Sequence, residues 1–519
     1  MKNIFGKIIC TLALSLALSS CDLNLFPEAT QVYDPEKPYY TQLKDVESTQ
    51  TSIYIYFRSV SGTYASDFMF DAFNLVNGTG NNYGDLHRCD ETFTSSSSTA
   101  ESLWAAHYSA IKNYNIAIEA AENAENESFY NYAQFVKAEA LIARAYSYLT
   151  LARHFGPAYD SDTAYEDYCV PLVLKYDQKE RPHRASMEEV YSQIAEDLSL
   201  AREIMMAPES KKWLNSPVAM SNYFTTDVIS FLEARMLLDT QEYKAAADTA
   251  VYIIKRKTYS LSSSAEKLKE INSSDTGTEA IMQCYASKSE GSKSYGVFLG
   301  LEKDGDSETG FSYKPYFLPS QKLMDSYSSS DYRRVSWFEQ SGTTSGTHPI
   351  KNEGSMYSNI FLFTKYKGNA ALSASGLEEG LVASKPFLIG ELYLIAAEGY
   401  YKSNQNSLAL HYLAELQKAR GAVPVSEITD ANLQLEWFKE TVGEGLRLSC
   451  LKRWNKGFNG RDGQERAVEQ GLLLNAVPDL YLNKVMEADD YHLCWPIPYY
   501  EIQCNSNLEK EQNFGYSAE

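Results

Sequence analysis

Long segments of this sequence place apolar residues at steps of three and four, and this period constrains the fold more than any other feature. The steps match one face of an α-helix, which turns once about every 3.6 residues. In one segment the shared face carries Trp104, Tyr108, Ile111, Asn115 and Ile118, and in the next it carries Ala138, Leu141, Ala145, Tyr148 and Ala152. Because proline cannot continue a helix, the second should end at Gly156-Pro157.

Further helices follow at short intervals along the chain. Ser186 and Glu189 form a capping box ahead of Val190, Ile194, Leu198 and Ala201, which fall on one helical face. We expect helices at about 223–238 and from about 243, and an antiparallel pair at 387–403 and 408–420 around Asn404. Small residues that permit close crossings are Ala246, Ala250, Ala396 and Ala397. Helix pairs of this kind predict a mainly α fold, a tetratricopeptide-like helical-hairpin scaffold.

The predicted repeats, at about 101–259 and 385–420, are interrupted by an irregular stretch. Residues 260–380 are rich in Ser, Gly and Tyr, with β-prone runs at 280–285 and 360–366. We therefore expect a large loop-rich insertion with a few short strands, and a C-terminal segment at 421–519. Long loops on a rigid scaffold are where binding residues usually lie.

The N-terminus has the layout of a lipoprotein signal. Residues 1–20 carry Lys2 and Lys7, then an apolar run at 8–18, then small residues directly before Cys21. The apolar run is about half the length that a membrane-spanning helix needs. We predict that 1–20 is removed, that Cys21 is lipidated, that 21–40 is a tether and that 41–519 is the folded body. The alternative is an ordinary signal with a chance cysteine.

The formal net charge of −21 excludes one class of partner. Nucleic acids and anionic lipids are bound through clusters of Lys and Arg, so we expect neither here, and membrane contact only through the lipid anchor. Six cysteines remain after Cys10 and Cys21, and none forms C-x-x-C, so no zinc site is predicted. A Cys494–Cys504 disulfide and buried free thiols both stay open.

Several fragments, taken in order, carry a resemblance to a known family. They are Trp104 to Asn115, Arg144-Ala145 to Phe155-Gly156, Glu391-Leu392-Tyr393-Leu394 with Ala397-Glu398, Glu444-Gly445 with Leu451-Lys452-Arg453-Trp454, and Trp495-Pro496-Ile497-Pro498 followed by Gln512-Asn513 and Gly515-Tyr516. In this order, behind a lipoprotein signal, the chain resembles the SusD/RagB family of outer-membrane nutrient-binding lipoproteins over nearly its whole length.

The resemblance implies a fold, a location and partners. It implies four tetratricopeptide-like units with a loop-rich region on the opposite side. It also implies an outer-membrane lipoprotein that faces the cell exterior, captures oligosaccharides and passes them to a SusC-like TonB-dependent barrel transporter. No cofactor is implied.

Two loops carry the residue types that bind sugars. Sugar rings stack on aromatic faces, and their hydroxyls bond to amides, carboxylates and guanidinium groups. One loop spans 74–93 and the other 301–317. We predict Tyr83 and Tyr313 as stacking platforms, with Tyr316 beside them and Asn81, Asp85 and Arg88 as hydroxyl partners. The competing interpretation is that these loops are solvated turns or face the barrel. Trp104 and Trp495 are predicted to be core residues.

The sequence lacks the common catalytic motifs. It has no H-E-x-x-H, no Walker loop and no G-x-S-x-G elbow, so we expect capture without catalysis. Asp304, Asp306 and Glu308 could hold calcium, but their spacing is not that of an EF-hand. Two alternative functions remain, a transporter lid with little sugar affinity of its own and a surface glycosidase.

Overall fold

Two long antiparallel helices form the centre of the helical part of the protein. The computed structural model describes residues 39–79, 83–126, 128–177, 179–303, 310–342 and 347–518. Helix α4 spans Ser98–Glu122 and helix α5 spans Tyr130–Phe155, which confirms the first two predicted helices. Helix α5 ends at Gly156, directly before Pro157, as expected. The predicted signal, Cys21, Asn81 and the candidate calcium run 304–309 lie outside the described residues.

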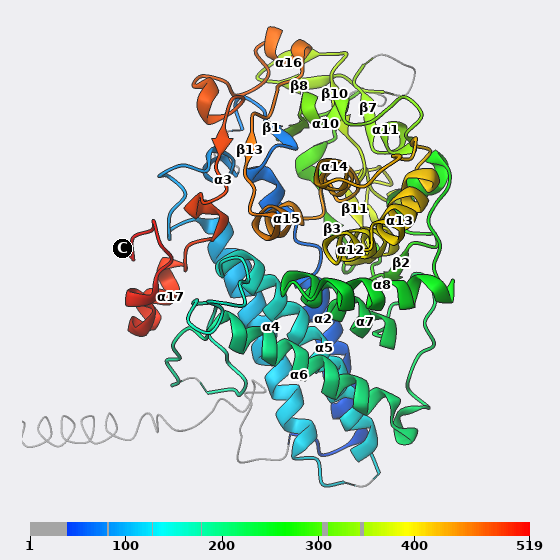
Figure 1. Ribbon diagram of the computed structural model, residues 1–519, viewed down its shortest axis with the longest axis vertical. Helices are drawn as coiled ribbons and strands as arrows, with labels where there is room; N and C mark the ends of the chain where they lie inside the picture. Colours follow the sequence, from blue (N-terminus) through cyan, green and yellow to red (C-terminus); the bar gives the residue numbers. More distant parts are fainter. Residues whose placement is uncertain are drawn as a thin grey trace, which may run out of the picture.

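Further helices, long and short, make up the rest of the helical structure in the described residues. They are α2 Leu43–Val60, α6 Met187–Met206, α7 Thr226–Asp239, α8 Tyr243–Arg256, α9 Ala265–Ser273, α12 Ile389–Lys402, α13 Asn406–Ala419, α14 Asp430–Glu440 and α15 Arg447–Trp454, with the short helices α3 Gly84–Arg88, α10 Gln321–Asp325, α11 Tyr332–Ser336, α16 Glu465–Glu469 and α17 Tyr499–Cys504. Each of α4 to α8 packs on the next, and α8 then packs on α12 and α12 on α13. The helical stack therefore continues from α8 directly to α12, although the insertion separates these two helices in the sequence (Figure 1).

The predicted start and turn signals act as expected. The hydroxyl of Ser186 accepts a hydrogen bond from the Glu189 amide, and the Glu189 carboxylate accepts one from the Ser186 amide, which starts α6. Asn404 has a φ of 60° between α12 and α13. Asn tolerates this left-handed conformation better than most residues, which allows the tight reversal.

The crossing of α8 and α12 requires small residues. Ala246, Ala250, Ala396 and Ala397 are fully buried. At Gly399 a Cβ atom would lie 2.3 Å from the carbonyl oxygen of Tyr243 and 2.9 Å from the Cβ of Ala247. Only glycine fits there, so the backbones approach within a distance that any side chain would prevent.

The strands are short and pair in antiparallel twos. The pairs are β1 Phe73–Leu75 with β6 Phe317–Pro319, β2 Ala280–Met282 with β12 Phe387–Leu388, β3 Lys293–Ser294 with β11 Leu381–Val382, β4 Glu302–Lys303 with β5 Phe311–Ser312, β7 Phe338–Gln340 with β10 Phe361–Phe363, β8 Ile350–Asn352 with β9 Ser355–Tyr357, and β13 Phe458–Asn459 with β14 Val485–Met486. Strands β2 and β10 lie in the predicted β-prone runs. In Figure 1 the strands β1, β7, β8 and β10 lie at the end of the molecule opposite α4, α5 and α6. The mainly α scaffold with a loop-rich insertion is thus confirmed.

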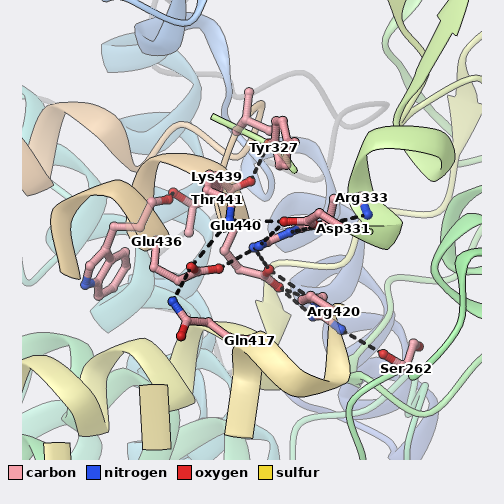
Figure 2. Close-up of polar contacts among 12 residues, drawn as sticks. Ser262, Tyr327, Asp331, Arg333, Gln417, Arg420, Glu436, Lys439, Glu440 and Thr441 are labelled. Carbon is pink, nitrogen blue, oxygen red and sulfur yellow. Dashed lines mark hydrogen bonds and ion pairs between the residues drawn. The ribbon is translucent and has the colours of Figure 1, made fainter. Parts of the chain in front are cut away.

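A buried ion network joins the insertion to the last helices (Figure 2). Arg333 of α11 lies 2.8 Å from Asp331 and 2.7 Å from Glu440 of α14. Arg420, directly after α13, lies 2.7 Å from Glu279 and 2.5 Å from Glu440. Each arginine has more than one carboxylate partner, and removing a charged member of such a buried network is strongly destabilising.

The core also holds the two tryptophans predicted there and most of the cysteines. Trp104 is 2% exposed and Trp495 fully buried. All six cysteines in the described part of the chain are free thiols, including Cys494 and Cys504. Among the described residues, no helix combines the length and apolar character needed to cross a bilayer.

Candidate functional site

A cleft of about 1050 Å³ opens where the helical stack meets the loop-rich insertion. One wall is the N-terminal part of α4, and the end of α2 and the start of α3 border it. Segments of the insertion at 291–302 and 314–316 close the other side. The volume is near the upper end of the range for small-molecule sites, which is about 300–1,000 Å³.

Three partly exposed tyrosines, Tyr64, Tyr83 and Tyr316, line the cleft. Neighbouring rings fix two of them. Tyr64 stacks on Tyr295 with centroids 4.6 Å apart, and Tyr83 lies 5.1 Å from Phe68. Burial raises the pKa of Tyr83, so its phenol is neutral at physiological pH. Tyr64 and Tyr83 therefore present rings at the cleft that neighbouring aromatic side chains hold in place.

Tyr83 holds an unusual backbone conformation at the start of α3. Its φ is 59° and its ψ is 19°, in the left-handed region that a bulky residue rarely adopts. Such a conformation costs on the order of 1–3 kcal/mol and persists where surrounding structure enforces it, often at binding sites. The packing against Phe68 supplies that enforcement here.

One group of polar side chains in the cleft comes from α4. Ser98, Thr99 and Ser102 line it from one face of that helix. Asp85 lines it from α3, and its Oδ2 accepts a hydrogen bond of 3.0 Å from the hydroxyl of Ser97, the residue before α4. Hydroxyls and a carboxylate beside aromatic rings are the groups that a saccharide can use for hydrogen bonds and stacking.

The structure brings together three of the predicted site residues. Tyr83 and Asp85, from the first loop, line the same cleft as Tyr316 from the second. Arg88 lies outside the cleft lining, where its Nη2 donates to the Thr92 hydroxyl at 2.8 Å. Asn81 lies outside the described residues.

Tyr313 does not take the position predicted for a stacking platform. Its side chain is 1% exposed and packs in a second core cluster with Ile350 and Leu318. Its hydroxyl donates to Glu339 at 3.3 Å. A buried ring offers no face to a ligand, so we leave Tyr313 out of the proposed site.

Sequence reasoning missed several lining residues. Tyr64 lies just after α2, a helix that the apolar pattern did not reveal, and Arg58 lies inside it. Lys293 and Lys314 belong to the insertion, where no local period indicates which side chains face a cleft. The glycine at position 62 indicates a turn ahead of Tyr64, but it does not indicate that Tyr64 faces a cleft.

Within the part of the chain that the structure describes, no three His, Cys, Asp or Glu side chains are grouped so that they could hold a metal ion.

Comparisons with known proteins agree with this fold and indicate the family. A family model described as starch-binding and associating with the outer membrane, of the SusD-like type, matches residues 37–221. A SusD family model matches residues 386–516, and the two together match more than half of the chain. No curated protein matches.

Solved structures cover nearly the whole chain. A SusD superfamily protein from Bacteroides thetaiotaomicron is 21% identical with a TM-score of 0.71, and the match covers 90% of this chain and 99% of that one. A SusD-like carbohydrate binding protein from Bacteroides vulgatus is 18% identical with a TM-score of 0.66, covering 91% and 98%. Surface glycan-binding protein A from Bacteroides fluxus is 20% identical with a TM-score of 0.65, covering 92% and 100%. At these identities the likeness establishes the fold, and together with the two family models it shows that the chain belongs to the SusD/RagB family.

Proposed function

We propose that this protein captures glycans in the cleft between α4 and the insertion. The observation that carries the proposal is the set of three partly exposed tyrosine rings, Tyr64, Tyr83 and Tyr316, around one cleft of about 1050 Å³. Rings held by Tyr295 and Phe68 are already ordered before a ligand arrives. Binding then costs little side-chain entropy.

In this proposal the mechanism is binding without chemistry. The C–H faces of sugar rings stack on the tyrosines, and their hydroxyls exchange hydrogen bonds with Asp85, Ser98, Thr99 and Ser102. The cleft-lining carboxylates are Asp85 and Glu302. Asp85 is bonded to Ser97, and Glu302 lies 3.3 Å from Lys314, so each already has a partner.

We further propose where the protein acts and what receives the glycan. Lipidation at Cys21 would hold the body at the outer membrane, facing the cell exterior, and a SusC-like TonB-dependent barrel would accept the ligand. Family membership and the pattern of residues 1–21 support this assignment. Co-purification of a TonB-dependent barrel with this chain, from membranes solubilised in mild detergent, tests the partner.

The test of glycan capture uses Tyr83→Ala and Tyr316→Ala. Truncating an aromatic residue at the centre of a binding site commonly costs about 2 kcal/mol or more, which is more than tenfold in Kd. Affinity electrophoresis against a glycan panel and calorimetry on the retained glycan measure this loss. Tyr165→Ala is the matched control, because this tyrosine is 62% exposed and lies outside the cleft. Equal affinity in all three variants removes the cleft from the proposal.

The same panel separates the two alternative functions. A wild-type protein that no glycan retards favours a transporter lid with little sugar affinity. Shortened oligosaccharides after incubation with the panel favour a surface glycosidase. Retardation without products is the result that we expect.

A further inference from the structure

The cleft differs in charge from the rest of the molecule. The chain has a formal net charge of −21. The cleft, in contrast, is lined by three cations, Arg58, Lys293 and Lys314, and two carboxylates, Asp85 and Glu302. Exposed charges farther away than about 8 Å are largely screened at physiological salt. A ligand in the cleft therefore responds to the arrangement of these local charges rather than to the acidic exterior.

Carboxylates already pair with two of the three cations. Arg58 Nη2 lies 3.1 Å from Glu290 Oε1, and Lys314 Nζ lies 3.3 Å from Glu302 Oε1. Asp85, the other carboxylate of the cleft, accepts a hydrogen bond from Ser97. The two ion pairs are each compensated and contribute little net attraction for a charged ligand, whereas Asp85 keeps its negative charge beside α3 and Ser97.

Lys293 is the cation without such a partner. Its Nζ donates to the backbone oxygen of Ser61 at 2.9 Å, and among the described residues no carboxylate pairs with it. An ammonium group carries three donors, so two remain for a ligand. The backbone of Lys293 is fixed by the pairing of β3 with β11, opposite Val382. Burial lowers the pKa of Lys293, as expected for a cation that has lost water without gaining a counter-charge.

The wall of α4 adds no opposing charge. Ser98, Thr99 and Ser102 come from its first turns, where the helix dipole favours an anion. His107 lines the same wall two turns along and is 1% exposed, with no hydrogen-bond partner for either ring nitrogen among the described residues. Burial, then His154 and Lys293, lower its pKa to about 3, so its imidazole is neutral. The hydroxyls and the neutral imidazole of this wall therefore do not cancel the positive charge of Lys293.

We infer that the cleft selects saccharides that carry an anionic group, with that group bound by Lys293 and the sugar rings on the tyrosines. The group that Lys293 would bind is an anionic substituent of a sugar. It is either the carboxylate of a uronic or sialic acid or a sulfate ester. A charge-assisted hydrogen bond from Nζ to this group replaces the water that burial removed. This inference rests on the proposed capture of glycans and names their class.

The experiment compares acidic glycans with uncharged versions of the same polymers. The panel contains polygalacturonate, alginate and hyaluronan for carboxylates, chondroitin sulfate and dextran sulfate for sulfates, and galactan, xylan and dextran as neutral members. Each acidic glycan that retards the protein is tested again after carboxyl reduction or desulfation, which keeps the linkages. We expect at least one acidic glycan to bind and its uncharged form to bind at least tenfold more weakly.

The variant Lys293→Met assigns the effect to one side chain, since it keeps the length of the stem and removes the charge. We expect it to weaken the acidic glycan at least tenfold, and Lys293→Arg to retain binding. Lys244→Met is the matched control, because this lysine also pairs with a carboxylate, Asp248, but lies outside the cleft, and its affinity should change less than threefold. Thermal unfolding of each variant checks that the fold is intact.

The outcomes separate this inference from the proposed function. Retention of neutral glycans alone, or an acidic glycan that binds Lys293→Met as tightly as wild type, overturns the inference and leaves glycan capture standing. Retention of no glycan in the panel overturns both. Loss confined to the carboxylate arm or to the sulfate arm identifies which anion the lysine holds.

Discussion

Arg420 and Glu440 form an ion pair in the protein interior, with Nη2 of the arginine 2.5 Å from Oε1 of the glutamate. Arg333 contacts the other carboxylate oxygen at 2.7 Å. Burial by itself would raise the pKa of Glu440, but Arg420 and Arg333 outweigh it and hold the pKa at about 2. Because Arg333 belongs to the insertion and Glu440 to α14, the Glu440 carboxylate links the loop-rich insertion to the helices that follow it.

We expect Glu440→Gln to lower the free energy of unfolding by about 3–5 kcal/mol, since it takes from two buried guanidinium groups the carboxylate that they share. Urea denaturation followed by circular dichroism measures this. Glu469→Gln is the control, because its pair with Arg466 is more than half exposed and 3.6 Å long. The control should change stability by less than about 1 kcal/mol. Equal losses in both variants would show that burial does not decide the effect.

The same carboxylate predicts part of the acid sensitivity. Its folded-state pKa lies below the ordinary 4.5, so its contribution is fully present above pH 4.5 and is lost as pH falls toward about 2. Stability of the wild type should drop over this window more steeply than that of Glu440→Gln. Unfolding curves at pH 5, 4 and 3 compare the two slopes. Parallel slopes would contradict the assignment.

Glu139 predicts the opposite dependence. Burial raises its pKa to about 7, although Tyr54 and Gln50 donate to it at 2.5 Å and 2.8 Å. The folded state then binds the proton more tightly than the unfolded state, so stability falls as pH rises from about 4.5 through 7. We expect Glu139→Gln to remove this fall and to raise stability at pH 8 by on the order of 1–3 kcal/mol. A Glu139→Gln protein less stable than wild type at pH 8 would refute the prediction.

The helical scaffold was predictable where local signals agree. The apolar period, the Ser186 capping box and the Gly156-Pro157 stop fixed α4, α5 and α6 without any knowledge of contacts. Helix α2 was missed, although Val46, Thr49, Ile53, Phe57 and Val60 are buried along one face. Serine, threonine and β-branched residues dominate that segment and disfavour helix, so tertiary packing rather than propensity makes it helical.

The site was predictable in composition but not in detail. Two loops rich in tyrosine and polar residues do border one cleft, yet Tyr316 faces it and Tyr313 does not. The Tyr313 amide donates to the carbonyl of Pro349 at 2.8 Å, which places this residue against a distant segment of the insertion. Contacts between segments that are far apart in the chain leave no local pattern in the sequence. The position of Lys293 could not be predicted for the same reason, because it depends on the pairing of β3 with β11.

The crossing of α8 and α12 gives a sharp test of the helical stack. Gly399→Val would force a side chain into the space held by the Tyr243 carbonyl and Ala247, and we expect a loss of at least about 1–3 kcal/mol. Ala245→Val is the control, because it adds the same β-branched side chain on an exposed face of α8. Thermal unfolding should show a large decrease in Tm for the first variant and a small one for the second. An equal decrease in both would mean that helix propensity, not the close approach, is responsible.

Cys21→Ser tests the proposed lipid anchor. A serine cannot carry the thioether-linked lipid, and the loss of several acyl chains removes about 0.8 kcal/mol of membrane affinity for each buried CH₂. We expect the variant to leave the membrane fraction and to lose incorporated palmitate, as measured by fractionation and by mass spectrometry of the N-terminal peptide. Cys504→Ser, which removes an exposed thiol of the folded body, should leave both readouts unchanged. If Cys21→Ser fractionates with membranes as the parent does, the body is held there by something other than this lipid, and the pattern of residues 1–21 has been misinterpreted.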